Sequence, residues 1–206
     1  FIARMNEADH PALCGATLVL HGDRDHCQAL GGDYDFVTAT SKTLFRRCRV
    51  DQLPPRSEVE SKMKYVIGAA MFFRSDVLFR LGGLSEDYFL YYEELDVSHR
   101  LLPEERMSWA PEAIVYHKVG ASIGTAQSAR SSDLAIYFDQ RSRMRFYRNH
   151  LPTQLPFAFA KTIWTLAAYG RKLDLRALRS VVWGTIDSFT GRMRLPAHFR
   201  RMKSAQ

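Results

Sequence analysis

The stretch KYVIGAAMFFRSDVLFRLGGLSEDYFLYYEELDVSHRLL, residues 64–102, decides the fold class because strand and helix signals alternate along it. Its first part, residues 64–73, is an apolar run that predicts a buried strand with a break at Gly68. Residues 75–83 begin with a serine suited to an N-cap and end in two glycines, as a short helix does. Residues 92–102 open with acidic residues, stop before a proline, and predict a second helix.

Upstream of this stretch, the sequence predicts one more strand and a long irregular region. GATLVLHG, residues 15–22, is β-rich and apolar, which predicts a buried strand. The Gly- and Asp-rich residues 21–35 predict turns, and the polar, Pro-containing residues 38–63 predict a long surface loop.

Downstream, short strands give way to helices. MSWA at 107–110 and AIVYHK at 113–118 predict two short strands, and the small residues 120–132 predict a loop. Helical patterns then continue to the end of the chain, over residues 133–150, 154–171 and 175–191. The order predicts an α/β fold: a partial mixed sheet with helices over residues 1–150, followed by a helical extension over residues 151–206.

Charge divides the chain of 206 residues unevenly. The net charge is +7, but residues 1–140 sum to −5 and residues 141–206, with 14 basic and 2 acidic residues, sum to +12. An acidic body could hold a metal and a cationic transition state, whereas a basic region should meet phosphates of a nucleotide, a lipid-linked acceptor or a membrane surface. Nucleic acid is not an expected partner, because no recognition motif is present and aromatic residues are not interleaved as stacking platforms.

Cysteines and apolar runs bear on the compartment. Cys14, Cys27 and Cys48 form no CxxC pair, which favours a reduced, cytoplasmic location. The longest apolar stretch, residues 155–170, is interrupted by Lys161 and is too short to span a bilayer comfortably. Because the chain starts within an element, we expect it to be a fragment that lacks an N-terminal part.

Three acids open the helix predicted over residues 92–102: Glu93, Glu94 and Asp96. Acids in a first turn are favoured by the helix dipole, so a capped surface helix with an Asp96–Arg100 pair is one interpretation. The other is catalytic. A sugar hydroxyl is a very weak acid, and its attack requires a carboxylate within hydrogen-bond reach to take the proton.

His117 ends a predicted strand just before the loop of small residues. Such a histidine is commonly a hydrogen-bonded core residue. A neutral imidazole beside a diphosphate could instead bind Mg²⁺ or Mn²⁺.

Three segments in this order resemble bacterial family-2 glycosyltransferases of the rhamnosyltransferase-like type: YVIGAAMFFRSDVLFRLGGLSEDYFLYYEELDVSHRL, APEAIVYHKVGAS and YFDQRSRMRFYRNH. The resemblance covers about residues 15–150 and implies a GT-A fold. It also implies an inverting transfer of sugar from a nucleotide-sugar donor to a saccharide or lipid-linked acceptor, in cell-surface polysaccharide or glycolipid assembly.

The resemblance assigns roles to individual residues. The catalytic acid of the family falls on Glu94, with Glu93 before it and Asp96 after it. The metal-binding histidine falls on His117, which implies a divalent cation. Substrate-binding positions fall on five further residues, with the last two available to a leaving diphosphate: Gly68, Ala69, Arg74, Arg141 and Arg143.

The chain also departs from the family. Glu94 stands where the family usually has aspartate, and one extra methylene shifts the carboxylate by more than about 1 Å. No segment resembles the nucleotide-binding half with its Asp-x-Asp motif, so this fragment is expected to be inactive alone. Two Asp-x-Asp triplets, Asp23–Asp25 and Asp33–Asp35, fit turns better than a metal site.

The C-terminal region alternates apolar and basic residues. An apolar stripe of Leu175, Leu178, Val182 and Ile186 is accompanied by Lys172, Arg176 and Arg179. One interpretation is a helix packed on the domain with a solvated basic face. The other is an interfacial helix pair, which predicts peripheral contact with the inner face of the plasma membrane.

Two other function classes compete with the transferase. A non-catalytic membrane-associated binding module would fit the missing donor half and the basic tail. A metal hydrolase fits less well, because one histidine and scattered acids do not form a recognised ligand set.

Overall fold

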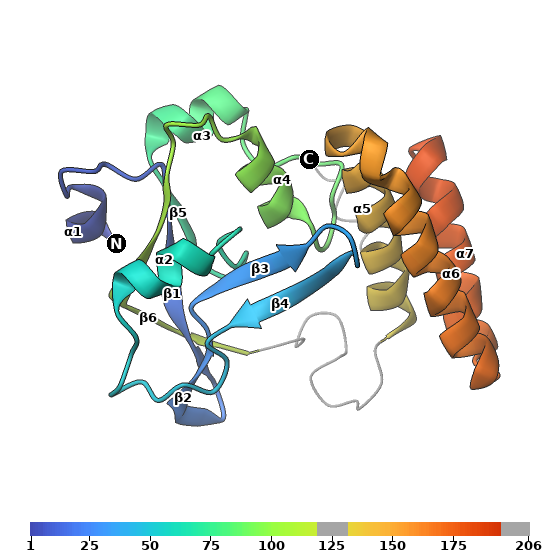
Figure 1. Ribbon diagram of the computed structural model, residues 1–206, viewed down its shortest axis with the longest axis horizontal. Helices are drawn as coiled ribbons and strands as arrows, with labels where there is room; N and C mark the ends of the chain where they lie inside the picture. Colours follow the sequence, from blue (N-terminus) through green and yellow to red (C-terminus); the bar gives the residue numbers. More distant parts are fainter. Residues whose placement is uncertain (119–131, 195–206) are drawn as a thin grey trace, which may run out of the picture.

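The computed structural model describes residues 1–118 and 132–194 (Figure 1). An α/β body fills one side of the molecule, and a layer of three helices, α5, α6 and α7, fills the other. The sheet contains both parallel and antiparallel strand pairs. The predicted fold class, a mixed α/β sheet followed by C-terminal helices, is confirmed.

The central strand is β1 (Leu13–Leu20). It pairs antiparallel with β2 (Asp23–Ala29) and β5 (Met71–Phe73), and parallel with β6 (Met107–His117). Seven of its eight residues are buried, as expected of an apolar run covered on both faces. The strand predicted over residues 15–22 is therefore confirmed, with a shift of two residues.

The two short strands predicted at 107–110 and 113–118 are one strand, β6, with an irregularity at Pro111. Pairing with β1 shifts register between Ala110 and Ile114. The hydroxyl of Thr17 donates a hydrogen bond of 2.8 Å to the Pro111 carbonyl within this bulge. A proline in a strand requires such an irregularity because it has no N–H for the ladder.

The polar loop predicted over residues 38–63 is wrong. It contains β4 (Thr40–Leu44), which pairs antiparallel with β3 (Gly31–Asp35), and the helix α2 (Arg56–Lys62). The turns predicted over 21–35 are likewise mostly strand. The ring of Tyr65 packs directly on Gly32 of the β3–β4 hairpin. A methyl group added at Gly32 would lie 2.0 Å from this ring, so the contact requires glycine.

The long strand predicted over residues 64–73 is also wrong, since only Met71–Phe73 is extended in the sheet. The helix α3 (Ser75–Leu81) follows it and ends at Gly82, whose φ of 67° confirms the glycine stop. The N-cap residue is Arg74 and not, as the sequence predicted, Ser75. No side chain makes a capping hydrogen bond at this end of α3. A short helix, α1 (Ile2–Met5), precedes the sheet.

Four helices complete the described chain: α4 (Glu93–Arg100), α5 (Asp133–His150), α6 (Leu155–Arg171) and α7 (Leu175–Thr190), with a 3-10 turn at Pro152–Gln154. The last three confirm the predicted helices, and α4 confirms the helix predicted over residues 92–102. Helix α5 is buried along much of its length. It packs closely on α7 at Gly184 of that helix, where an added methyl group would lie only 2.7 Å from the Tyr137 carbonyl oxygen. Within residues 1–118 and 132–194, none of the helices combines the length and apolar character needed to cross a bilayer.

Candidate functional site

The start of α4 brings two carboxylates together above Gly68. Tyr91 and Tyr92 adopt positive φ angles of 64° and 72°, which turn the chain sharply into the helix. A methyl group at Gly68 would lie 3.4 Å from an oxygen of Glu93 and 3.8 Å from Oε2 of Glu94. Among the described residues, the buried Oε2 atoms of Glu93 and Glu94 have no hydrogen-bond partner.

This environment changes the proton affinity of both acids. Burial, and then the charge of Glu93, raise the pKa of Glu94 to about 8. Burial also raises the pKa of Glu93. Two adjacent carboxylates in a poorly solvated site hold one proton between them near neutral pH, because charging both is costly. The pair can therefore accept or release a proton near neutral pH.

Glu94 lines a cavity of about 260 Å³. The cavity lies where the β3–β4 hairpin, the segment after α2, and helices α4, α5 and α6 meet. Four tyrosines contribute to its wall: Tyr34, Tyr65, Tyr91 and Tyr92. Its charged lining residues besides Glu94 are Asp139, Arg143 and Lys161.

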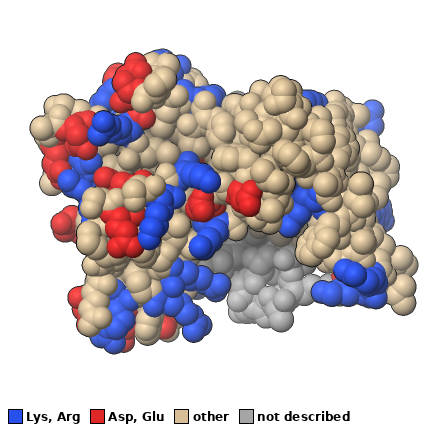
Figure 2. Space-filling model, in the orientation of Figure 1, with Lys and Arg blue, Asp and Glu red and all other residues tan. Residues whose placement is uncertain are grey.

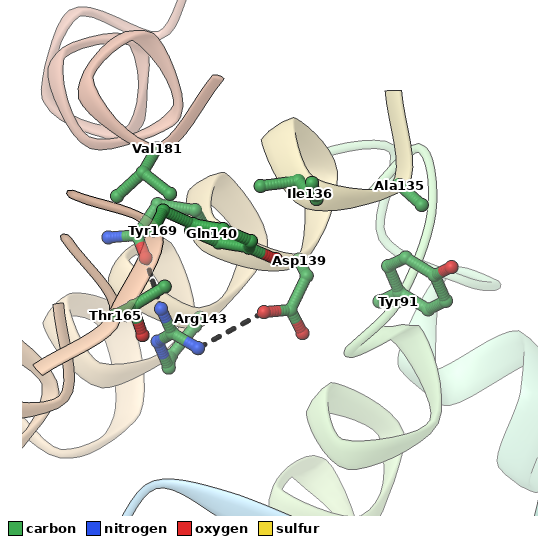
Figure 3. Close-up of a pocket in the computed structure, with 9 residues that line it drawn as sticks. All are labelled: Tyr91, Ala135, Ile136, Asp139, Gln140, Arg143, Thr165, Tyr169 and Val181. Carbon is green, nitrogen blue, oxygen red and sulfur yellow. Dashed lines mark hydrogen bonds and ion pairs between the residues drawn. The ribbon is translucent and has the colours of Figure 1, made fainter. Parts of the chain in front are cut away.

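A second cavity of about 230 Å³ adjoins the first between α5, α6 and α7 (Figure 3). Tyr91, Asp139 and Arg143 line both cavities. Arg143 donates to Asp139 at 3.1 Å and also to the side-chain oxygen of Gln140. Arg143 therefore lies between the two hollows, held by groups of its own helix.

Asp96, predicted to flank the catalytic acid, points elsewhere. Its carboxylate is buried and accepts hydrogen bonds from Arg100 at 2.6 Å and from His150 at 2.8 Å. It is not among the described residues that line the Glu94 cavity. Asp96 therefore ties α4 to the end of α5, and the Asp96–Arg100 pair predicted from the i,i+4 spacing is confirmed.

The predicted substrate-binding residues are dispersed. Arg141 is buried and donates to the backbone carbonyls of Arg192 at 2.8 Å and Asp87 at 2.7 Å, so it joins segments of the fold. Arg74 is half-buried and pairs with Asp76 at 2.7 Å. Ala69 is exposed beside Gly68. Of the five, Gly68 lies against the acids and Arg143 lines their cavity.

His117 lies at the end of β6, where its Nδ1 is 2.9 Å from the side-chain oxygen of Gln28. It is not among the described residues that line the Glu94 cavity. The loop predicted over 120–132 lies almost wholly outside the described residues. In the described part of the chain, no three His, Cys, Asp or Glu side chains gather in an arrangement that could hold a metal ion. The described residues thus do not complete a metal site at His117, and the divalent cation stays a prediction.

The two Asp-x-Asp triplets make local contacts. Asp23 lies 2.9 Å from the ring of His26. Asp33 pairs with Lys64 at 3.0 Å, and Asp35 accepts a hydrogen bond of 2.8 Å from the Val37 N–H. Asp23 and Asp35 lie at the ends of β2 and β3, and Asp33 lies within β3.

Sequence reasoning missed Lys161, Asp139 and the tyrosines of the cavity. For Lys161 a signal was present, since it is the one charge within the apolar stretch at 155–170. Burial, and then the charge of Arg143, lower the pKa of Lys161. Tyr34 and Tyr65 carry no local signal, because only the packing of the hairpin brings them to the acids.

Comparison of the sequence with protein-family models and with curated proteins finds no match. Membership of the family-2 glycosyltransferases therefore stays a prediction that depends on the order of the motifs around Gly68, Glu94 and His117.

Proposed function

We propose that this protein belongs to an inverting sugar transferase of the family-2 type. It would move a sugar from a nucleotide-sugar donor to a hydroxyl of a saccharide or lipid-linked acceptor, in assembly of cell-surface polysaccharide or glycolipid on the cytoplasmic side. The observation that supports this most strongly is the Glu93–Glu94 pair of buried carboxylates, of which Glu94 lines a cavity large enough for a sugar ring.

In this proposal Glu94 is the general base. The acceptor oxygen attacks the anomeric carbon, its proton passes to the Glu94 carboxylate, and the bond from the anomeric carbon to the phosphate oxygen breaks. The nucleoside diphosphate leaves with that electron pair. Glu94 acts as a base in its ionised form, whose fraction grows as the pH rises towards its pKa of about 8, and that form is a stronger base than an ordinary glutamate.

The rest of the cavity suits the same substrates. Tyrosine rings offer flat apolar faces and hydroxyls, which suit a sugar ring. Arg143 and Lys161 bring positive charge to the cavity, and among the described residues Lys161 makes no ion pair. We infer that Lys161 and Arg143 attract the phosphate-bearing part of a substrate.

The test is a transfer assay on the complete gene product, including any segment encoded upstream of Phe1. A panel of nucleotide sugars is offered to wild type, Glu94→Gln and Glu86→Gln, the last being a matched control at an exposed position. We expect Glu94→Gln to lower turnover by roughly 10²–10⁴-fold, because removing a general base has that effect. Near-normal turnover in Glu94→Gln would show that the base is another group.

The alternative, a non-catalytic membrane-associated binding module, is favoured by one observation. The exposed residues of α6 before its last turn are apolar. Calorimetry with nucleotide sugars separates the two functions, because the module would bind lipid vesicles and no donor.

A further inference from the structure

The outer face of α6 is apolar. From Pro156 to Ala167, every exposed residue of this helix is apolar. The largest of these side chains keep a substantial exposed fraction: Phe157 41%, Phe159 39%, Ile163 67% and Trp164 61%. Of the polar residues in this range, Thr162 is buried and accepts a hydrogen bond from Gln140 of α5, whereas Thr165 bonds within its own helix and Lys161 is half-buried.

Helix α7 extends this surface. Phe159 stacks on Phe189 at a centroid distance of 6.1 Å, which joins the two helices along one face. Val182, Ile186 and Phe189 of α7 are 43–45% exposed. The apolar stripe predicted on α7 thus faces outward, whereas its small residues, such as Gly184, pack on α5. We call the exposed apolar side chains of both helices the α6–α7 face.

Single exposed apolar residues are ordinary, but a continuous apolar face marks an interaction surface. Its surroundings indicate the partner. Residues 141–206 contain only two acids, Asp174 and Asp187, and Asp187 is buried and paired with Arg194. Lys161 lies 4.7 Å above the ring of Trp164, and Arg148 lies 5.7 Å above that of Phe189.

Exposed basic residues gather at the junction of the two helices: Arg171, Lys172, Arg176 and Arg179. In Figure 2 the surface over the C-terminal helices is mostly uncharged, with Lys and Arg at its lower end and also at its upper and right edges. A second copy of this chain is a poor occupant, because residues 141–206 offer only two acids that could pair with this basic rim. An apolar face with an aromatic residue and a basic rim instead matches the interface of an anionic bilayer.

We propose that the α6–α7 face docks on a membrane surface that contains anionic lipids, with α6 lying along the interface. Phe157, Ile163 and Trp164 insert among the lipids, and the basic rim contacts the headgroups. Lys161 of the same helix lines the Glu94 cavity, so docking brings that cavity close to the bilayer. If the proposed transferase activity is correct, its acceptor is then a lipid-linked hydroxyl compound. Docking itself does not depend on that activity.

The test is co-sedimentation of the protein with two kinds of vesicle, phosphatidylcholine alone and phosphatidylcholine mixed with phosphatidylserine. Wild type should bind the anionic vesicles, and added salt should weaken binding through screening. Ile163→Glu should lower the affinity for anionic vesicles by at least about tenfold. The change removes an inserted apolar side chain and adds a negative charge, which the anionic lipids repel. Phe79→Glu, at a position on α3 that is 83% exposed, is the matched control and should bind as wild type does.

Circular dichroism and thermal unfolding of both variants verify that each is folded, and both positions are exposed enough to accept glutamate. Equal binding by Ile163→Glu and wild type, or no binding by folded wild type, would overturn the proposal. So would a wild-type dimer in light scattering that Ile163→Glu abolishes, because the face would then join two copies. Transfer to a water-soluble acceptor, measured on the same Ile163→Glu variant, tests the proposed function separately, since Ile163 does not line the Glu94 cavity.

Discussion

Replacement of Glu94 by glutamine should change how stability depends on pH. The folded chain holds the Glu94 proton up to a pKa of about 8, whereas an unfolded chain releases it at an ordinary value of 4.5. Between these values the folded state binds more protons than the unfolded state. The free energy of unfolding of wild type therefore falls as pH rises through this window, and this loss is complete only above about pH 8.

The magnitude follows from the same two values. Each pH unit inside the window lowers the stability by about 1.4 kcal/mol, so the fall between about pH 6 and about pH 8 is about 2 kcal/mol. Glutamine has nearly the same shape and cannot ionise, so Glu94→Gln lacks this loss. The stability difference between Glu94→Gln and wild type should therefore grow by about 2 kcal/mol over that range.

Urea unfolding of both proteins at several pH values measures this difference and cancels the titration of groups that the replacement leaves unaffected. Glu86→Gln provides the control, because Glu86 is exposed and its replacement should leave a difference independent of pH. A pH-independent difference for Glu94→Gln as well would mean that Glu94 titrates as an ordinary exposed carboxyl. The environment described for the Glu93–Glu94 pair would then be wrong.

Three further outcomes are expected. Gly184→Ala should lower the free energy of unfolding, measured in urea titrations, by about 1–3 kcal/mol. The added methyl group would lie 2.7 Å from the Tyr137 carbonyl oxygen, so α7 must move. An unchanged urea midpoint would contradict the close packing of α7 on α5. Asp96→Asn should cost about 2–4 kcal/mol, since it replaces a buried carboxylate that holds His150 at 2.8 Å; lost donor binding with unchanged stability would instead place Asp96 in the site. Lys161→Met should weaken pyrophosphate binding, measured by calorimetry, by about tenfold, because a positive charge of the cavity is removed. The melting temperature should stay nearly unchanged, because Lys161 is partly exposed. Equal affinity of variant and wild type for pyrophosphate would exclude Lys161 from phosphate binding.

Local sequence patterns predicted the helical half of the molecule well. The α5, α6 and α7 helices agree with their predicted ranges within a residue, because capping residues and the 3.6-residue period act over short distances. The side chain of Ser132 caps α5 by accepting from the Ala135 N–H. The apolar strand β1 was recognisable for the same reason, since a strand buried on both faces is apolar throughout.

The hairpin of β3 and β4 was not predictable from local patterns. The residues of β4 are mostly polar and exposed, and they are extended because they hydrogen-bond to β3. The segment at 64–70 shows the opposite error. It is apolar but forms no regular strand, and it pairs with the β3–β4 hairpin only through an isolated bridge between Tyr65 and Gly32. In both cases the partner, rather than the residue's own preference, decides the backbone conformation.

The sequence by itself determined the α/β class, the C-terminal helices, the clustering of acids at residues 93–96 and the uneven charge. Only the tertiary structure decided that Glu94 faces a cavity while Asp96, two residues later, binds His150 on another side of the helix. It also decided that Lys161 joins that cavity and that the apolar side of α6 faces outward. The physical reason is that residue type and helical period are local properties, whereas the direction a helix face points depends on every element packed against it.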